Sequence, residues 1–167
     1  PWDNLKYDSE GVKETARKLF ATLYNTYSFF ALYANVDGFD NSAPQVPLTE
    51  RPEIDRWILS LLNTLIREVD EALDDYEPTK AARAINDFVN DNLSNWYVRL
   101  NRKRFWGGEM DVDKLSAYQT LYTCLETVAL LMAPISPFFA DRLYTDLTSV
   151  TKGSTESVHL ALFPEAG

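Results

Sequence analysis

The stretch DNLSNWYVRLNRKRFW, residues 91–106, ends a long apolar stripe in a cluster of basic side chains. The stripe begins at Ala81, and its apolar residues recur every three or four positions, which is the spacing of one helix face that packs on a core. Its last turns carry four of the sixteen Lys and Arg residues with no acid among them, and Gly107 and Gly108 follow. The pattern predicts a helix that ends near Arg104 and whose last turns carry a local cluster of positive charge. These basic residues are Arg99, Arg102, Lys103 and Arg104.

Three other long segments have the same helical periodicity, and a shorter one follows Pro137. Four long helices and a short fifth predict an all-α, antiparallel up-and-down bundle. Asp8 or Ser9 can cap the first helix, and a loop rich in Gly, Asn, Asp and Pro is expected at 35–47. The expected helices are 9–34, 52–77, 81–104, 112–133 and 138–147. Their inward faces include Tyr76, Trp96, Tyr97, Leu100 and Cys124.

The length of 167 residues suits one domain with a real core. Residues 1–8 would lead into the bundle at 9–148, and 149–167 would form a short extended tail in which Ser157–Phe163 is β-capable. With 46% hydrophobic and 25% charged residues the chain is expected to be globular. It has no apolar run of about 18 or more residues and no visible signal peptide, so we expect a cytoplasmic protein without a membrane partner.

Catalytic and metal-binding patterns are missing from the sequence. One cysteine and one histidine exclude a disulfide and a Cys/His zinc site. There is no phosphate-binding Gly-rich loop and no GxSxG motif. His159 lies in an alternating apolar run without a nearby nucleophile, and the acidic pairs at 70–71 and 74–75 fit a solvated helix face. We therefore expect no catalytic residue, no metal and no cofactor in this chain.

The basic cluster has the composition of a nucleic-acid contact. Cations beside Trp96, Phe105 and Trp106 are expected where a protein meets a phosphate backbone and unstacked bases. The net charge of −9 limits this to a local, oriented contact, because distant negative charge repels phosphate. Arg99, Arg102 and Lys103 share one helical face and can follow phosphates.

A structural interpretation of the same residues remains open. Arg99 and Arg102 can instead pair with acids such as Asp87, Asp91 or Asp113. Trp96 and Tyr97 continue the apolar stripe and are assigned to the core, whereas Trp106 lies beyond it.

Bundle geometry places the cluster. In an antiparallel bundle the C-terminal ends of the first and third helices share a pole, which brings Asn25–Ala34 near Arg99–Arg104. A helix of about 25 residues is roughly 37 Å long, so the start of the chain lies at the opposite pole.

Several motifs resemble the isoleucyl-tRNA synthetase family of class I synthetases, in its helical anticodon-binding domain. The resemblance covers essentially the whole chain. The blocks that carry it are PWDNLKYD at the N-terminus, LYNTYSFFALYANVDGF, RPEIDRWILSLLN, DNLSNWYVRLNRKRFW, APISPFFADRLY and SVHLALFP.

The resemblance implies a parent enzyme that uses ATP and Mg²⁺, forms AMP, charges tRNA(Ile) and hydrolyses mischarged valine. The HIGH-like and KMSKS-like signatures are absent here, so the chain is expected to be a non-catalytic fragment. It would lie between a catalytic core and a C-terminal region and bind the tRNA(Ile) anticodon stem-loop. Positions matching the family's Asn-x-x-x-Phe anticodon segment are Asn25 and Phe29. Ser28 replaces the arginine of the valine relatives, so that contact is not carried over.

The RNA-binding residues expected from these arguments are Asn25, Phe29, Arg99, Arg102, Lys103, Arg104 and Trp106. The alternative function is a structural bundle that docks the other domains of a synthetase and has little RNA specificity of its own. Charge reversal at Arg102 and Lys103 distinguishes the two.

Overall fold

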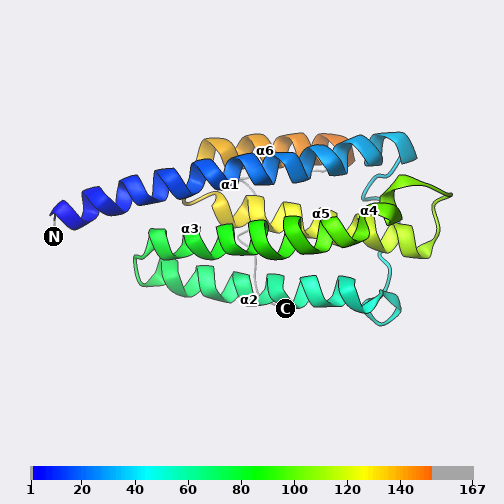
Figure 1. The fold of residues 1–167 in the computed structure, drawn as a ribbon, viewed down its shortest axis with the longest axis horizontal. Helices are drawn as coiled ribbons and strands as arrows, with labels where there is room; N and C mark the ends of the chain where they lie inside the picture. The colour runs from blue at the N-terminus through cyan, green and yellow to red at the C-terminus, as the bar shows by residue number, and fades with distance from the viewer. Residues whose placement is uncertain (1, 152–167) are drawn as a thin grey trace.

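The computed structural model describes the backbone of residues 2–151 and the side chains of residues 13–149. The described part is an up-and-down bundle of helices without a strand, as the periodicity predicts (Figure 1). After α1 and α2, the third long helical segment is continuous from Pro78 to Trp106. It consists of α3, the π-helical segment η2 and α4, and we call it the third rod. None of the described helices is long and apolar enough to cross a membrane. The elements are α1 (Trp2–Asp37), η1 (Leu48–Glu50), α2 (Glu53–Asp74), α3 (Pro78–Asp87), η2 (Phe88–Val98), α4 (Arg99–Trp106), α5 (Val112–Met132) and α6 (Pro137–Thr151).

The first helix is longer than expected at both ends. Residues 2–8 contain neither Pro nor Gly, so α1 begins at Trp2, and the expected caps Asp8 and Ser9 lie inside the helix. The helix ends at Gly38, which adopts a φ of 68°. The Phe39 amide then donates to the Ala34 carbonyl at 2.9 Å, the bond that closes a Schellman motif. The last helix, α6, also runs past its expected end to Thr151, and the β-capable segment 157–163 lies outside the described residues.

The third rod buries every fourth residue. An α-helix turns about 100° per residue, so a spacing of four drifts by about 40° at each step. A π-helix bonds residue i to i+5 and has a wider turn, and η2 therefore keeps the stripe facing the core. The stripe consists of Ile85, Val89, Leu93, Tyr97, Asn101 and Phe105.

Three large side chains expected inside lie on the surface. Trp96 is 55% exposed, and Leu100 is exposed one turn later, because the spacing of four turns both outward. Tyr76 is 92% exposed because it follows the end of α2 in a left-handed conformation, with φ 58°. Tyr97 and Cys124 are fully buried as expected, and burial raises the pKa of the Cys124 thiol.

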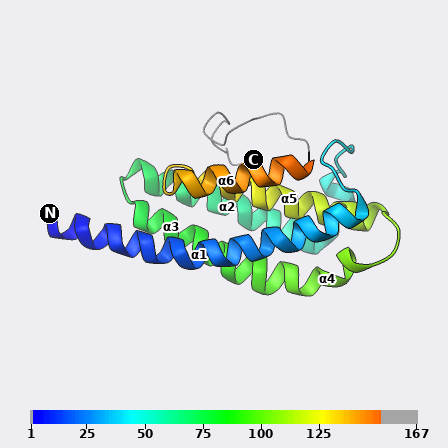
Figure 2. The ribbon, with the colours of Figure 1, turned by 90° about the horizontal axis from the view of Figure 1, so that it is seen from above.

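One end of the bundle, here called the distal pole, holds the C-terminal ends of α1 and α4 and the first turns of α2 and α5 (Figures 1 and 2). The rings of Phe29 in α1 and Phe105 in α4 meet there with centroids 5.3 Å apart. The expected convergence of these two helices is confirmed. Helix α1 begins at the opposite end, where it extends beyond the other helices (Figure 2).

Two leucines of the third rod test its spacing of four. Leu93→Ala removes a fully buried side chain, and we expect a loss of about 2–5 kcal/mol in the free energy of unfolding. The matched control Leu100→Ala removes an exposed one and should change that free energy by less than about 0.5 kcal/mol. Urea unfolding followed by circular dichroism measures both. Equal losses would contradict the assigned rotation of the rod.

Candidate nucleic-acid interface

A fully buried carboxylate, that of Asp55 in the first turn of α2, organises the distal pole. The Arg104 guanidinium donates to both of its oxygens, with Nη1–Oδ1 at 2.6 Å and Nη2–Oδ2 at 2.9 Å. The Tyr97 hydroxyl donates to Oδ1 at 2.7 Å and the Ser116 hydroxyl to Oδ2 at 2.5 Å. Donors from η2, α4 and α5 thus meet at one acid of α2.

These contacts determine whether the Asp55 carboxyl group is charged. Burial by itself raises the pKa of Asp55, but the hydrogen bonds from Arg104, Ser116 and Tyr97 outweigh burial and hold that pKa below its ordinary value. Burial lowers the pKa of Arg104, and Asp55 more than compensates, so that pKa is raised. The pair is therefore ionised at neutral pH.

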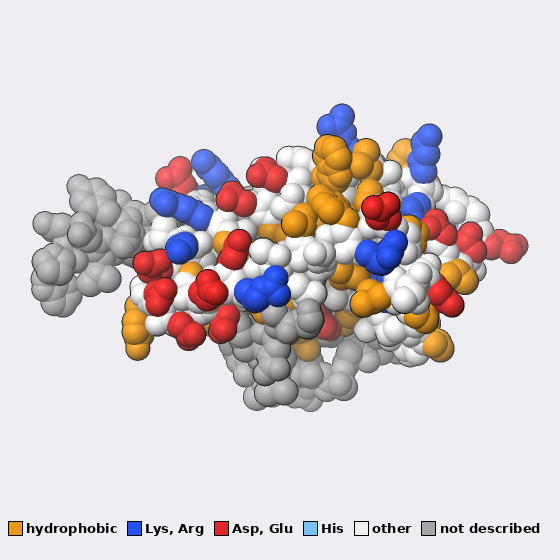
Figure 3. Space-filling view, turned by 90° about the horizontal axis from the view of Figure 1, so that it is seen from below, with side chains coloured by type: hydrophobic (Ala, Val, Ile, Leu, Met, Phe, Trp, Pro, Cys, Tyr) orange, Lys and Arg blue, Asp and Glu red, His pale blue; other side chains and the backbone are white. Residues whose placement is uncertain are grey.

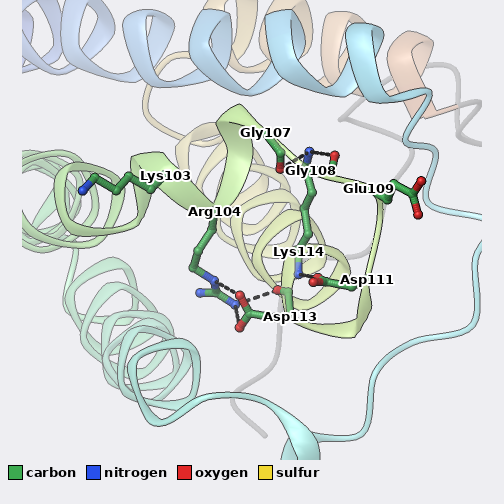
Figure 4. Close-up of a pocket in the computed structure, with 8 residues that line it drawn as sticks. All are labelled: Lys103, Arg104, Gly107, Gly108, Glu109, Asp111, Asp113 and Lys114. Atoms are coloured by element: carbon green, nitrogen blue, oxygen red, sulfur yellow. Dashed lines mark hydrogen bonds and ion pairs between the residues drawn. The ribbon is translucent and has the colours of Figure 1, made fainter.

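A second polar cluster joins α1 to α5. Lys114 is buried, and its ammonium lies 2.8 Å from Asp37 Oδ2 at the end of α1. The Tyr118 hydroxyl also donates to Asp37. Lys114 donates further to the carbonyls of Gly107 and Gly108, at 3.3 and 3.4 Å. The same side chain therefore holds both the end of α1, through Asp37, and the loop that follows α4, where Figure 4 shows its bonds to Gly107 and Gly108.

Buried polar groups of α5 also hold the loop between α1 and α2. The Gln119 side chain accepts from the Val46 amide at 2.8 Å and donates to the Pro44 carbonyl at 3.0 Å. Arg51 donates to the Val46 carbonyl at 2.9 Å and to the Thr120 hydroxyl at 3.0 Å. The two loops at the distal pole are thus hydrogen-bonded to the same helix, α5.

The basic cluster divides into one inward and three outward cations. Arg104 is only 14% exposed and is paired with Asp55 and, at 3.1 Å, with Asp113. Arg99, Arg102 and Lys103 are exposed, and they form no ion pair with another described residue. The ion pairs considered in the structural interpretation, Arg99 or Arg102 with Asp87, Asp91 or Asp113, are not formed in the described part of the chain. Lys103 and Arg104 both line a hollow of about 290 Å³, in which the Arg104 guanidinium meets Asp113 (Figure 4).

Among the other expected contact residues, Phe29 and Trp106 lie at the distal pole and Asn25 lies one turn before Phe29 on α1, and the three differ in accessibility. Asn25 and Trp106 are exposed. Phe29 is half-buried and packs against the rings of Tyr33 and Phe105, so its main contacts are inside the bundle. Among the expected site residues, Asn25, Arg99, Arg102, Lys103 and Trp106 therefore form the accessible group.

Sequence reasoning missed the buried polar groups that shape this pole. Asp55 lies three residues before the buried Ile58, on the inner face of α2, and that position was the available signal. Lys114, Ser116 and Gln119 belong to α5, a helix buried around most of its circumference, and a buried polar residue requires a hydrogen-bonding partner. The periodicity of each helix does not say which partner that is.

The class of this domain follows from its similarity to known sequences. Residues 55–167 match the family described as the anticodon-binding domain of tRNA ligase, and the chain belongs to that family. It is 74% identical over 99% of its length to an isoleucine–tRNA ligase of Bacteroides thetaiotaomicron. It is 71% identical over 98% to one of Porphyromonas gingivalis and 51% identical over 99% to one of Dehalococcoides mccartyi. The chain spans only 14% to 16% of the length of these relatives.

Asp55→Asn tests the buried carboxylate. The substitution leaves the Arg104 charge without its buried partner, and we expect a loss of about 3–5 kcal/mol in the free energy of unfolding at pH 7. Asp113→Asn is the matched control, because Asp113 is a half-exposed partner of the same arginine and should cost about 1 kcal/mol or less. Urea unfolding measures both variants. Equal, small losses would show that Asp55 is not the anchor.

The pH dependence of stability gives a second test of Asp55. Its pKa in the folded chain lies below the ordinary value of 3.8, so the folded state binds fewer protons than the unfolded state between those two values. This stabilisation is fully present above about pH 4 and is lost as the pH falls through the folded pKa. The wild-type free energy of unfolding should therefore fall more steeply below pH 4 than that of Asp55→Asn. Parallel curves would contradict the assignment.

Proposed function

We propose that this domain binds the anticodon stem-loop of isoleucine tRNA as part of an isoleucine–tRNA ligase. Family membership and the relatives named as isoleucine–tRNA ligases support the assignment. The observation that carries it is the set of three exposed cations on α4, which form no ion pair within the described chain although the net charge is −9. Cations left free in an acidic protein suit an external anion such as phosphate.

The proposed contact surface spans α4 and the adjoining side of α1. Arg99, Arg102 and Lys103 would neutralise backbone phosphates of the RNA. At about 100° per residue, Asn25 lies on the exposed side of α1 next to Phe29, whose ring contacts α4. Its amide can donate to and accept from base edges, and the exposed indole of Trp106 offers a face on which a base can stack.

Two residues expected to touch RNA receive a positioning role in this proposal. The Arg104 guanidinium donates its hydrogen bonds to Asp55, Asn101 and Asp113. These bonds fix how α4 is rotated about its axis against the bundle. Phe29 spaces α1 from α4 through Phe105. Neither side chain needs to contact RNA to matter for binding.

The layout of the bundle suits a spacer between a bound anticodon stem-loop and a catalytic core. The start of α1 and the basic cluster lie at opposite ends (Figure 1). In this proposal a catalytic core joins at the α1 end and supplies the ATP- and magnesium-dependent charging of tRNA. A C-terminal region would follow the segment beyond residue 148.

The docking alternative has one specific observation in its favour. Leu32 and Val36, both on α1 near the distal pole, are exposed apolar side chains. Such side chains suit contact with another protein domain. If the bundle served only to dock domains, removing cations from α4 would leave RNA affinity unchanged.

The double charge reversal Arg102→Glu/Lys103→Glu tests RNA binding. We expect the affinity for a labelled isoleucine-tRNA anticodon stem-loop to fall by about tenfold or more. The slope of log affinity against log salt should become shallower by about one to two units, because two phosphate contacts are lost. Titrations at several salt concentrations, beside a loop-scrambled RNA, measure both quantities.

The matched control is Lys80→Glu/Arg83→Glu at the turn between α2 and α3. It changes the net charge by the same amount, but both residues are exposed at the opposite pole. Its RNA affinity should stay within about threefold of the wild type, since the screening length is only about 8–10 Å in ordinary buffers. Equal losses for the two double variants would reduce the effect to net charge and contradict the proposed interface.

A further inference from the structure

A second exposed aromatic surface lies beside the basic cluster, where η2 and the start of α4 adjoin α2. We call it the tryptophan patch; it consists of Trp57, Trp96 and Leu100. The two indole centroids are 6.4 Å apart with an interplanar angle of 55°, so Trp57 supports Trp96 from α2. Trp57 is half-buried, whereas Trp96 and Leu100 are more than half exposed. Figure 3 shows hydrophobic side chains raised along the edge formed by the third rod, with basic side chains beside them.

The tryptophan patch is bordered by the same cations as the proposed RNA interface. Arg99 follows Trp96 by three residues, and Lys103 follows Arg99 by four, so the three lie along one exposed strip. On α2 the exposed neighbours of Trp57 along the helix are Glu53 and Ser60. Two exposed cations, Arg99 and Lys103, thus lie beside the patch in a chain of net charge −9.

Trp96 and Trp106 lie at opposite ends of this strip, because Trp106 follows Lys103 by three residues. Trp96 is joined to α2 through Trp57, whereas the end of α4 is joined to α1 through Phe105 and Phe29. The tryptophan patch is therefore continuous with the proposed interface through Arg99 and Lys103, and it lies at the end of the strip that is joined to α2.

We propose that the tryptophan patch is a stacking platform for one unpaired nucleotide of the RNA held at the distal pole. Trp96 would receive the base on its indole face, while Arg99 and Lys103 bind the flanking phosphates. The proposal rests on the proposed function and adds a second contact surface to it. Aromatic faces beside cations are the combination by which proteins bind single-stranded nucleic acid without reading its sequence.

The packing favours a nucleotide over an apolar protein segment as the occupant. A docking segment would gain from a wide apolar surface, but the patch has only two well-exposed side chains, Trp96 and Leu100. It would also have to cover Arg99 and Lys103, which form no ion pair with a described residue, and desolvating unpaired cations is costly. A nucleotide brings the apolar face and the negative charge together.

The test compares two substitutions at Trp96 and two RNAs. Trp96→Leu keeps an apolar side chain and removes the aromatic face, and Trp96→Phe keeps a smaller aromatic face. Phe138→Leu is the matched control, since Phe138 is an exposed aromatic side chain at the start of α6, at the opposite pole. Each full chain is titrated with the isoleucine-tRNA anticodon stem-loop and with the same stem-loop carrying abasic loop nucleotides. Thermal unfolding confirms that each variant is folded.

Trp96→Leu should bind the native stem-loop roughly fivefold to 150-fold more weakly than the wild type, the range of one lost base stack. Its affinity for the abasic RNA and its salt dependence should equal those of the wild type. Trp96→Phe should retain most of the affinity, and Phe138→Leu should retain all of it.

Three results would overturn the proposal. If Trp96→Leu binds the native loop like the wild type while Arg102→Glu/Lys103→Glu does not, the stacking platform is wrong and the proposed function stands. If Trp96→Leu weakens binding to both RNAs equally, the lost contact is not a base stack. If the wild-type chain binds neither RNA, the proposed function fails and the platform fails with it.

Discussion

The carboxylate of Asp55 is the group on which the arrangement of the distal pole depends. An ionised carboxylate without solvent is strongly unfavourable unless donors surround it. Tyr97, Arg104 and Ser116 supply those donors from η2, α4 and α5, while Asp55 itself belongs to α2. Because one acid needs all three partners at once, the helices have one rotation and one register in which it is satisfied. The basic surface takes its shape from that requirement.

The same requirement explains how an acidic chain presents a positive surface. Two inward cations are paired with inward acids, Arg104 with Asp55 and Lys114 with Asp37, and the buried Arg51 donates to uncharged oxygens instead. Burial raises the pKa of Asp37, but its hydrogen bonds to Lys114 and Tyr118 outweigh burial and lower it. The cations that remain on α4 are directed outward. The distal pole is therefore sorted into a hydrogen-bonded interior and a small charged exterior, which is the layout that an oriented RNA contact needs.

The π-helical segment connects the core to this surface. It keeps a stripe of spacing four facing inward from Ile85 to Phe105. Tyr97 therefore points to Asp55, and its neighbour Trp96 points to solvent beside Trp57. A regular α-helix would let the stripe drift around the rod over these twenty residues. The π-helical segment thus determines both which side chains pack in the core and which aromatic and basic side chains face outward.

Local periodicity was enough to predict the bundle, most helix positions and the shared pole of α1 and α4, because each follows from residues within a few turns of one another. The sequence by itself also identified the accessible residues Asn25, Arg102 and Trp106. Only the tertiary structure decided that Arg104 turns inward, that Trp96 turns outward and that Asp55 is the anchor. Those outcomes depend on contacts between residues 42 to 61 positions apart, such as Tyr97 and Ser116 with Asp55. Helical periodicity carries no information about a partner at that distance, and the need of a buried charge for donors selects it only when the helices pack.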